Sequence, residues 1–131
     1  MVIDSSAILA ILLKEPERDR FLNVIATAPN RFMSVMSMIE IGIVARSRLG
    51  TRGFEQAVAI LDAFAVDVVP LTRHLAELAV GAHQRFGRGH HPAKLNMGDC
   101  CSYALALDLG QPLLFKGNDF SQTDAQPALP L

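Results

Sequence analysis

The chain of 131 residues has the length of a single domain, and its apolar fraction of 50% excludes a disordered protein. The absence of any sequence repeat excludes a collagen-like or solenoid protein. Twelve Lys and Arg residues oppose thirteen Asp and Glu residues, which gives a formal net charge of −1. The overall charge therefore does not mark a nucleic-acid binder, and any binding of a polyanion must depend on a local concentration of basic residues.

Short apolar runs alternate with helical patterns along the chain. In chain order, the first half predicts a strand at 2–3, a helix at 7–13 capped by Ser5 or Ser6, a helix from Pro16 to about Ala28, a strand at 31–34, a helix from about Met36 that stops before Gly50, and a helix at 54–64. The second half predicts a strand at 66–71, a helix from the N-cap Thr72 to Phe86, a loop at 87–92, a helix from Asn96 or Gly98 to about Leu109 that Gly110 closes, a strand at 113–115, and an irregular tail from about residue 125. Within the helix after Met36, the spacing of Met36, Ile39, Ile43 and Val44 predicts one apolar face.

Strands that alternate with helices predict an α/β fold, with a short parallel sheet covered by helices on both faces, in one domain over residues 1–131. Cys100 and Cys101 are adjacent, which argues against a framework disulfide and against a zinc site, and we expect both thiols to pack within a helix. The N-terminus has no basic region typical of a signal peptide, and the early apolar run at 7–13 is too short to span a bilayer. We therefore expect a cytoplasmic protein with no membrane segment.

Four acids occupy positions that ordinary surface acids do not. Asp4 terminates the first predicted strand, Asp99 opens a predicted helix, and Asp119 follows the last strand. Glu40 is embedded in an apolar helical stretch that leaves the same edge of the sheet. Because ligands of parallel sheets bind outside the carboxyl ends of the strands, we expect these four side chains to share one pocket.

Each acid also has a purely structural interpretation. Asp4 can cap the first helix, and Glu40 can close a capping box with Ser37 if the helix begins there. Asp99 in a first helical turn gains ~0.3–1 kcal/mol from the helix dipole, and Asp119 can be an ordinary turn residue. Taken singly, none of the four acids decides between the two interpretations.

Together, the four acids predict a cation site. Carboxylates that converge in a partly apolar cleft repel one another unless a cation neutralises them. No His or Cys accompanies the acids at metal-ligand spacing, and oxygen-only ligands favour magnesium or manganese over zinc. Waters and a phosphate would complete the coordination shell.

Four features of the chain resemble PIN-domain proteins and, more narrowly, VapC-type toxins of bacterial toxin–antitoxin pairs. They are the opening Met-Val-Ile-Asp-Ser-Ser-Ala-Ile-Leu-Ala, Glu40 in its apolar helix, the segment Leu95-Asn-Met-Gly-Asp-Cys, and the segment Leu114-Phe-Lys-Gly-Asn-Asp-Phe-Ser-Gln-Thr-Asp. The resemblance extends over essentially the whole chain, with these features in the right order and spacing.

This resemblance implies a single PIN-like domain that acts as a magnesium- or manganese-dependent endoribonuclease and is held inactive by a partner antitoxin. The family's metal-binding and catalytic acids carry over onto Asp4, Glu40, Asp99 and Asp119. Supporting roles behind these ligands fall to Ser5, Asn96 and Asp124. One metal, or two if the substrate recruits a second, would direct a water in line at phosphorus and leave a 5′-phosphate and a 3′-hydroxyl.

The stretch at 84–94 predicts the RNA-binding surface. It holds three of the twelve basic residues and two of the four histidines, and no acid occurs between Glu77 and Asp99. The predicted RNA contacts are Arg85, Arg88, His90, His91, Lys94 and, beside Asp119, Lys116. A solvated flexible loop without RNA contacts is the open alternative.

The helices between residues 34 and 64 carry much apolar surface, including Met36, Met38, Ile41 and Phe54. Part of this surface should be core, and the rest would bind an antitoxin segment or a second copy of the chain. The expected assembly is a homodimer or a toxin–antitoxin hetero-oligomer.

Other function classes fit less well. A phosphorelay receiver would use a Lys after a late strand, as Lys116 is, but it needs an Asp at the end of its middle strand, and Asp67 precedes that strand's apolar core. A phosphatase with an aspartyl nucleophile needs a second acid that the segment after Asp4 lacks. A non-catalytic protein-binding α/β domain remains as an alternative.

Overall fold

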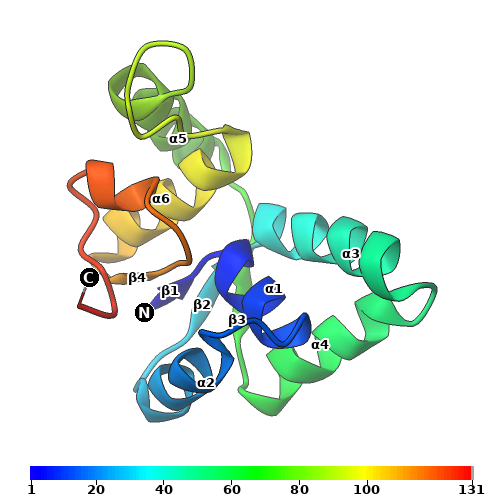
Figure 1. Cartoon of the computed structure of the whole chain (residues 1–131). Helices are drawn as coiled ribbons and strands as arrows, with labels where there is room; N and C mark the ends of the chain where they lie inside the picture. The colour runs from blue at the N-terminus through cyan, green and yellow to red at the C-terminus, as the bar shows by residue number, and fades with distance from the viewer. Residues whose placement is uncertain (131) are drawn as a thin grey trace.

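The computed structural model describes residues 1–130, and Figure 1 shows their arrangement. The strands are β1 (Val2–Ile3), β2 (Phe32–Ser34), β3 (Asp67–Val69) and β4 (Leu113–Leu114). The helices are α1 (Ser5–Leu12), α2 (Arg18–Thr27), α3 (Val35–Leu49), α4 (Gly53–Ala63), α5 (Arg73–Phe86), α6 (Met97–Leu109) and the short 3₁₀ helix η1 (Phe120–Gln122). Every strand and helix predicted from the sequence is present, which confirms the α/β fold.

The four strands form one parallel sheet in the order β3-β2-β1-β4. The chain lays β1, β2 and β3 side by side in one direction and then places β4 on the other side of β1. The carboxyl ends of β1 and β4 therefore flank the point where the strand order reverses, which is where α/β sheets bind ligands. Asp4 lies at this point, since its backbone N–H donates to the carbonyl oxygen of Leu114 at 2.9 Å.

Helices cover both faces of the sheet, as predicted. Because alternate strand residues point to opposite faces, Ile3, Met33 and Leu114 pack into one hydrophobic cluster with α1, α2, α3 and α4. Val2 and Leu113 pack into a second cluster with α5 and α6. Figure 1 shows the same division, with α5 and α6 on one side of the sheet. The predicted burial of both cysteines is confirmed, and both are free thiols.

Several helix ends lie where local residues predict them. The Thr72 hydroxyl accepts from the Leu75 N–H at 3.2 Å, and Gly110 ends α6 in the left-handed conformation at φ 59°. The first helix begins at Ser5, two residues before the predicted start, and of the caps considered, Asp4 and not Ser5 or Ser6 is its N-cap. The second helix begins at Arg18 instead of Pro16.

The apolar face predicted for α3 is not its buried face. Ile39 and Ile43 are 52% and 66% exposed, whereas Ser37, Ile41 and Ala45 are buried. The spacing was helical, but α1 and α4, with smaller contributions from α6 and the sheet, pack against the neighbouring side of the helix. Of the apolar residues that the sequence divides between core and partner surface, Ile41 belongs to the core, where it is fully buried.

The C-terminal tail is irregular, as predicted, but it follows β4 closely. The Leu113 N–H donates to Gln126 O, and the Ala128 N–H donates to Leu113 O, both at 2.8 Å. Within residues 1–130, no helix is long and apolar enough to cross a membrane.

Candidate functional site

The four predicted acids come from four segments that meet at the carboxyl edge of the sheet. Asp4 follows β1, Glu40 lies in α3, and Asp99 lies in the first turn of α6. Asp119 follows β4 at the start of η1, where it is exposed and makes no capping hydrogen bond.

Asp4 is a buried carboxylate, 3% exposed, that accepts hydrogen bonds at both oxygens. Its Oδ2 accepts from the N–H of Ser6 at 3.0 Å and from the Ser6 hydroxyl at 2.6 Å. Its Oδ1 accepts from the Ser102 hydroxyl at 2.6 Å. Asp4 therefore does cap α1, and the three donors also hold its side chain in one orientation.

Glu40 is the acid whose burial is least offset by polar contacts. Its Oε1 is buried and has no hydrogen-bond partner among the described residues. Burial, followed by the negative charges of Asp4 and Asp99, raises the pKa of Glu40 to about 7. The capping-box interpretation of Glu40 is wrong, because α3 begins at Val35 and Ser34 is its N-cap.

Asp99 combines a structural role with a perturbed charge. It forms a capping box with Asn96: the Asp99 N–H donates to Asn96 Oδ1 at 2.9 Å, and the Asn96 N–H donates to Asp99 Oδ2 at 3.0 Å. Burial nevertheless raises the pKa of Asp99 to about 6, against the opposing effect of the Asn96 N–H. The charges of Asp4 and Asp119 raise this pKa further.

The causes of the raised pKa values indicate which of the acids interact with one another. Asp4 affects both Glu40 and Asp99, and Asp119 affects Asp99. As the side chains lie, residues 1–130 contain no group of three or more His, Cys, Asp or Glu that could hold a metal ion. Hydrogen bonds within the protein also occupy oxygens of Asp4 and Asp99. Binding of a cation would therefore require some of these side chains to move closer together.

The charge and the donor atoms of this region fit a hard divalent cation. The unpartnered Oε1 of Glu40 lacks the positive or donor group that a buried carboxylate oxygen normally has. No basic group contributes to the perturbed pKa values of Glu40 and Asp99. All four side chains offer oxygen, the ligand that magnesium and manganese prefer.

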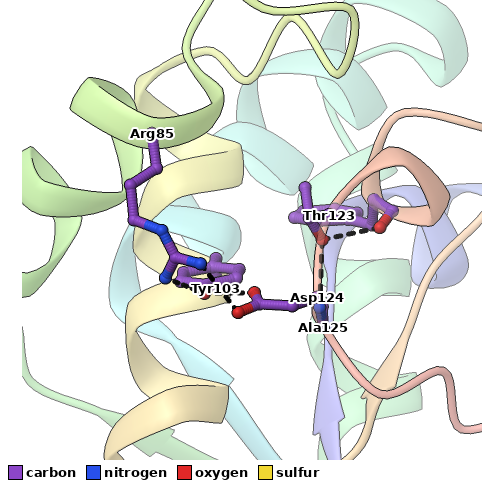
Figure 2. Close-up of polar contacts among 6 residues, drawn as sticks. Arg85, Tyr103, Thr123, Asp124 and Ala125 are labelled. Atoms are coloured by element: carbon purple, nitrogen blue, oxygen red, sulfur yellow. Dashed lines mark hydrogen bonds and ion pairs between the residues drawn. The ribbon is translucent and has the colours of Figure 1, made fainter.

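The supporting residues differ from those expected. The hydroxyls that donate to Asp4 belong to Ser6 and Ser102, and not to Ser5. Asn96 does contact a predicted ligand, since it caps α6 with Asp99. Asp124 contacts Arg85 and Tyr103 instead of the acids: its Oδ2 lies 2.8 Å from an Arg85 guanidinium nitrogen, and its Oδ1 accepts from the Tyr103 hydroxyl at 2.5 Å (Figure 2).

Two buried serines were missed by the sequence reasoning. Ser102 donates to Asp4, and its hydroxyl lies 3.1 Å from that of Ser37. The available signal was their position, because each serine interrupts an apolar helical stretch one turn from an acid, Ser37 before Glu40 and Ser102 after Asp99.

The predicted RNA contacts divide into two groups. Four of them line one open surface hollow of about 620 Å³, which we call the basic hollow: Arg88, His90, His91 and Lys94, together with Gly89 and Pro92. The other two are paired with acids, Arg85 with Asp124, and Lys116 with Glu15 and with Glu17, the latter at 3.4 Å. Among the described residues, Arg88 and Lys94 of the hollow form no ion pair, unlike Arg85 and Lys116.

Comparison of the sequence with those of known proteins identifies the family of this chain. Residues 1–126 match the PIN domain family. The chain is 44% identical over 131 residues to ribonuclease VapC30 of Mycobacterium tuberculosis, covering 99% of this chain and all of that protein. It is 45% identical over 124 residues to ribonuclease VapC of Mycolicibacterium smegmatis, covering 95% of this chain and 96% of that protein.

Solved structures agree at the level of the fold. The crystal structure of Mycobacterium tuberculosis VapC20, described as a sarcin-ricin loop cleaving toxin, superposes with a TM-score of 0.79 at 21% identity, covering 95% of each chain. A toxin–antitoxin complex from Klebsiella pneumoniae has a TM-score of 0.67 at 18% identity, covering 92% of this chain and 89% of that one. On the family match and the sequence identities, this chain belongs to the PIN-domain family and, within it, to the VapC ribonucleases.

Proposed function

We propose that this VapC ribonuclease cleaves RNA with a divalent cation, Mg²⁺ or Mn²⁺, bound by Asp4, Glu40, Asp99 and Asp119. The observation that supports the proposal most directly is the mutual repulsion of Asp4, Glu40 and Asp99, two of which have strongly raised pKa values. Repulsion of this kind costs free energy in the protein alone and is relieved by a bound cation.

The four acids would take different parts. Asp4 is already oriented by three donors, and Glu40 directs an unpartnered oxygen into the protein, so these two provide fixed oxygens. Asp99 keeps one oxygen for its capping box and offers the other. Asp119 is exposed and uncapped, so its side chain is free to turn toward Asp99.

When bound, such a cation supplies Lewis-acid chemistry, activating a water for attack on phosphorus and stabilising charge on the leaving oxygen. The protein's own part is electrostatic and geometric. In the cation-free protein the pKa of Glu40 is raised to about 7, so Glu40 would give up its proton near neutral pH as it binds the cation. Burial of Asp4 and half-burial of Glu40 limit competition from bulk water at these oxygens.

RNA would reach the acids from the basic hollow. The hollow lies in the segment just before α6, and Asp99 lies in the first turn of that helix. Phosphates bound by Arg88 and Lys94 would therefore continue toward the acids. Because RNA is the substrate, we place the protein in the cytoplasm.

We further propose that a cognate antitoxin binds and inhibits this protein, and the presence of a toxin–antitoxin complex among the structures of similar fold supports such a partner. The partner would cover part of the exposed apolar surface of α3 and α4, where Ile39, Ile43 and Phe54 are 52%, 66% and 41% exposed.

The decisive experiment incubates purified protein with RNA in EDTA and with Mg²⁺ or Mn²⁺ added back. We expect cleavage only with the added cation, and 5′-phosphates at the new ends. Asp99→Asn should be inactive with either cation. Cleavage in EDTA, or cleavage by Asp99→Asn at the wild-type rate, would contradict the proposal.

A further inference from the structure

Two fully buried hydroxyls lie behind the acids. Ser37 and Ser102 are each 0% exposed, and their Oγ atoms are 3.1 Å apart. Ser102 also donates to Asp4 Oδ1 at 2.6 Å. A serine hydroxyl can donate only one hydrogen bond. Because Ser102 donates to Asp4, it must accept the hydrogen bond that it shares with Ser37. The bonds therefore run in one direction, from Ser37 to Ser102 to Asp4.

The three hydrogen-bonded residues come from the same three segments of the chain as the acids Asp4, Glu40 and Asp99. Ser37 lies one helical turn before Glu40 on α3, and Ser102 lies one turn after Asp99 on α6. Residues three apart on a helix share a face, so each serine lies on the same side of its helix as the acid. The two hydrogen bonds thus join α3, α6 and the residue that follows β1.

We infer that Ser102 and Ser37 are positioning residues that set the spacing of the Asp4, Glu40 and Asp99 carboxylates and thereby the affinity for a divalent cation. This inference deepens the proposed function and rests on it. Three like charges repel, and packing alone resists their separation weakly because apolar contacts have no preferred direction. Two directional hydrogen bonds hold the helices and the Asp4 side chain against that repulsion.

The test measures Mn²⁺ binding to the purified full-length protein by isothermal titration calorimetry, beside thermal unfolding in EDTA. Ser102→Ala should weaken Mn²⁺ binding roughly tenfold, the scale seen when a group that orients a metal ligand is removed. Ser37→Ala should weaken it in the same direction by less, because Asp4 keeps its own donor. Ser102→Thr, which restores the hydroxyl, should recover binding, and saturating Mn²⁺ should restore RNA cleavage in Ser102→Ala.

Ser47→Ala is the matched control, since Ser47 is an exposed serine on the same helix as Ser37, and its variant should bind Mn²⁺ like the wild type. A purely structural role predicts that Ser102→Ala and Ser37→Ala unfold at lower temperature yet bind Mn²⁺ with unchanged affinity, and that result overturns the inference. If Ser102→Ala does not fold, unchanged binding by Ser37→Ala overturns it equally. Absence of Mn²⁺ binding by the wild type would overturn the proposed function together with this inference, whereas wild-type binding that neither serine affects would overturn the inference alone.

Discussion

Glu40 and Asp99 are two carboxylic acids whose ionisation depends strongly on the fold. Both carboxyls have raised pKa values, about 7 and about 6, with burial as the main cause. Near neutral pH, protons and a divalent cation therefore compete for these oxygens. This competition links the protein's stability, its cation affinity and its activity to pH.

The first prediction concerns stability in EDTA. Because the folded pKa values lie above the ordinary values of 4.5 and 3.8, the folded chain holds more protons than the unfolded chain between about pH 4 and pH 7. The contribution of these two acids to stability should therefore be most favourable below this window and be lost as the pH rises through it. Thermal unfolding of Glu40→Gln should show a weaker fall in melting temperature from pH 5 to pH 7 than the wild type. Equal slopes for the two proteins would contradict the raised pKa of Glu40.

The second prediction concerns activity. Asp4→Asn, Glu40→Gln and Asp99→Asn should each reduce RNA cleavage on the order of 10²-fold or more, the scale for losing a group that stabilises charge in the transition state. Circular dichroism should show that the fold is retained. The control is Asp62→Asn, an exposed acid on α4 that should cleave like the wild type. Full activity of the Glu40→Gln variant would show that Glu40 is not part of the catalytic site.

At the scale of elements, the position of Glu40 depends on how closely α3 approaches α6. A Cβ atom added at Gly98 would lie 2.0 Å from Glu40 Oε1, so glycine alone leaves room for this carboxylate at the start of α6. The same helix start carries Asp99 one residue later. The lack of a side chain at Gly98 therefore allows the Glu40 carboxylate to lie close to the helix start that carries Asp99.

The third prediction follows from this close approach. Gly98→Ala should displace the Glu40 carboxylate and weaken Mn²⁺ binding, as measured by calorimetry. Gly81→Ala is the control, because a Cβ at Gly81 in α5 meets nothing within 4 Å. That change should leave Mn²⁺ binding intact and raise stability by ~0.5–1 kcal/mol, the usual gain for Gly to Ala within a helix. Wild-type binding by Gly98→Ala would show that Glu40 does not need its present place.

The fourth prediction concerns the attachment of the C-terminal segment. Asp124 joins that segment to α6 through Tyr103 and to α5 through Arg85 (Figure 2). Asp124→Ala should release the segment, which limited proteolysis would detect as faster cleavage after residue 120. Glu77→Ala, which breaks an exposed ion pair with Arg73 within α5, should leave the proteolysis rate unchanged. Equal rates for Asp124→Ala and the wild type would mean that the β4 contacts hold the segment alone.

At the scale of the whole molecule, a net charge of −1 means that RNA binding must come from one face. Charge reversal of Arg85 is a poor test of that face, because it also breaks the hydrogen bonds to Asp124 and Tyr103. Charge reversal of Lys116 is a poor test for the same reason, because it also breaks the ion pairs with Glu15 and Glu17. Arg88 and Lys94 have no acidic partner among the described residues and are the informative positions.

The fifth prediction therefore reverses Arg88 and Lys94 to Glu in the inactive Asp99→Asn background. Binding of single-stranded RNA should weaken, and the log–log slope of its salt dependence should become shallower by about 0.7 for each phosphate that the protein no longer neutralises. Arg48→Glu, on the exposed end of α3, serves as the control for net charge and should keep the wild-type slope. An unchanged slope in the double variant would support the alternative of a solvated loop without RNA contacts.

The sequence by itself determined the features that depend on near neighbours in the chain. Thr72, Asn96 and Gly110 mark helix ends because capping uses backbone groups only a few residues away. The place of Asp4 after β1 followed in the same way from a strand pattern and the rule that parallel strands end at one edge.

Only the tertiary structure decided which contacts form between residues distant in the chain. The exposure of Ile39 and Ile43, the bond from Ser102 to Asp4, and the pairing of Lys116 with Glu15 each depend on how elements pack. Helical periodicity shows that residues share a face but does not say which neighbour covers it. Hydrogen bonds and ion pairs require atoms within about 3–4 Å, and packing of the whole chain sets those distances.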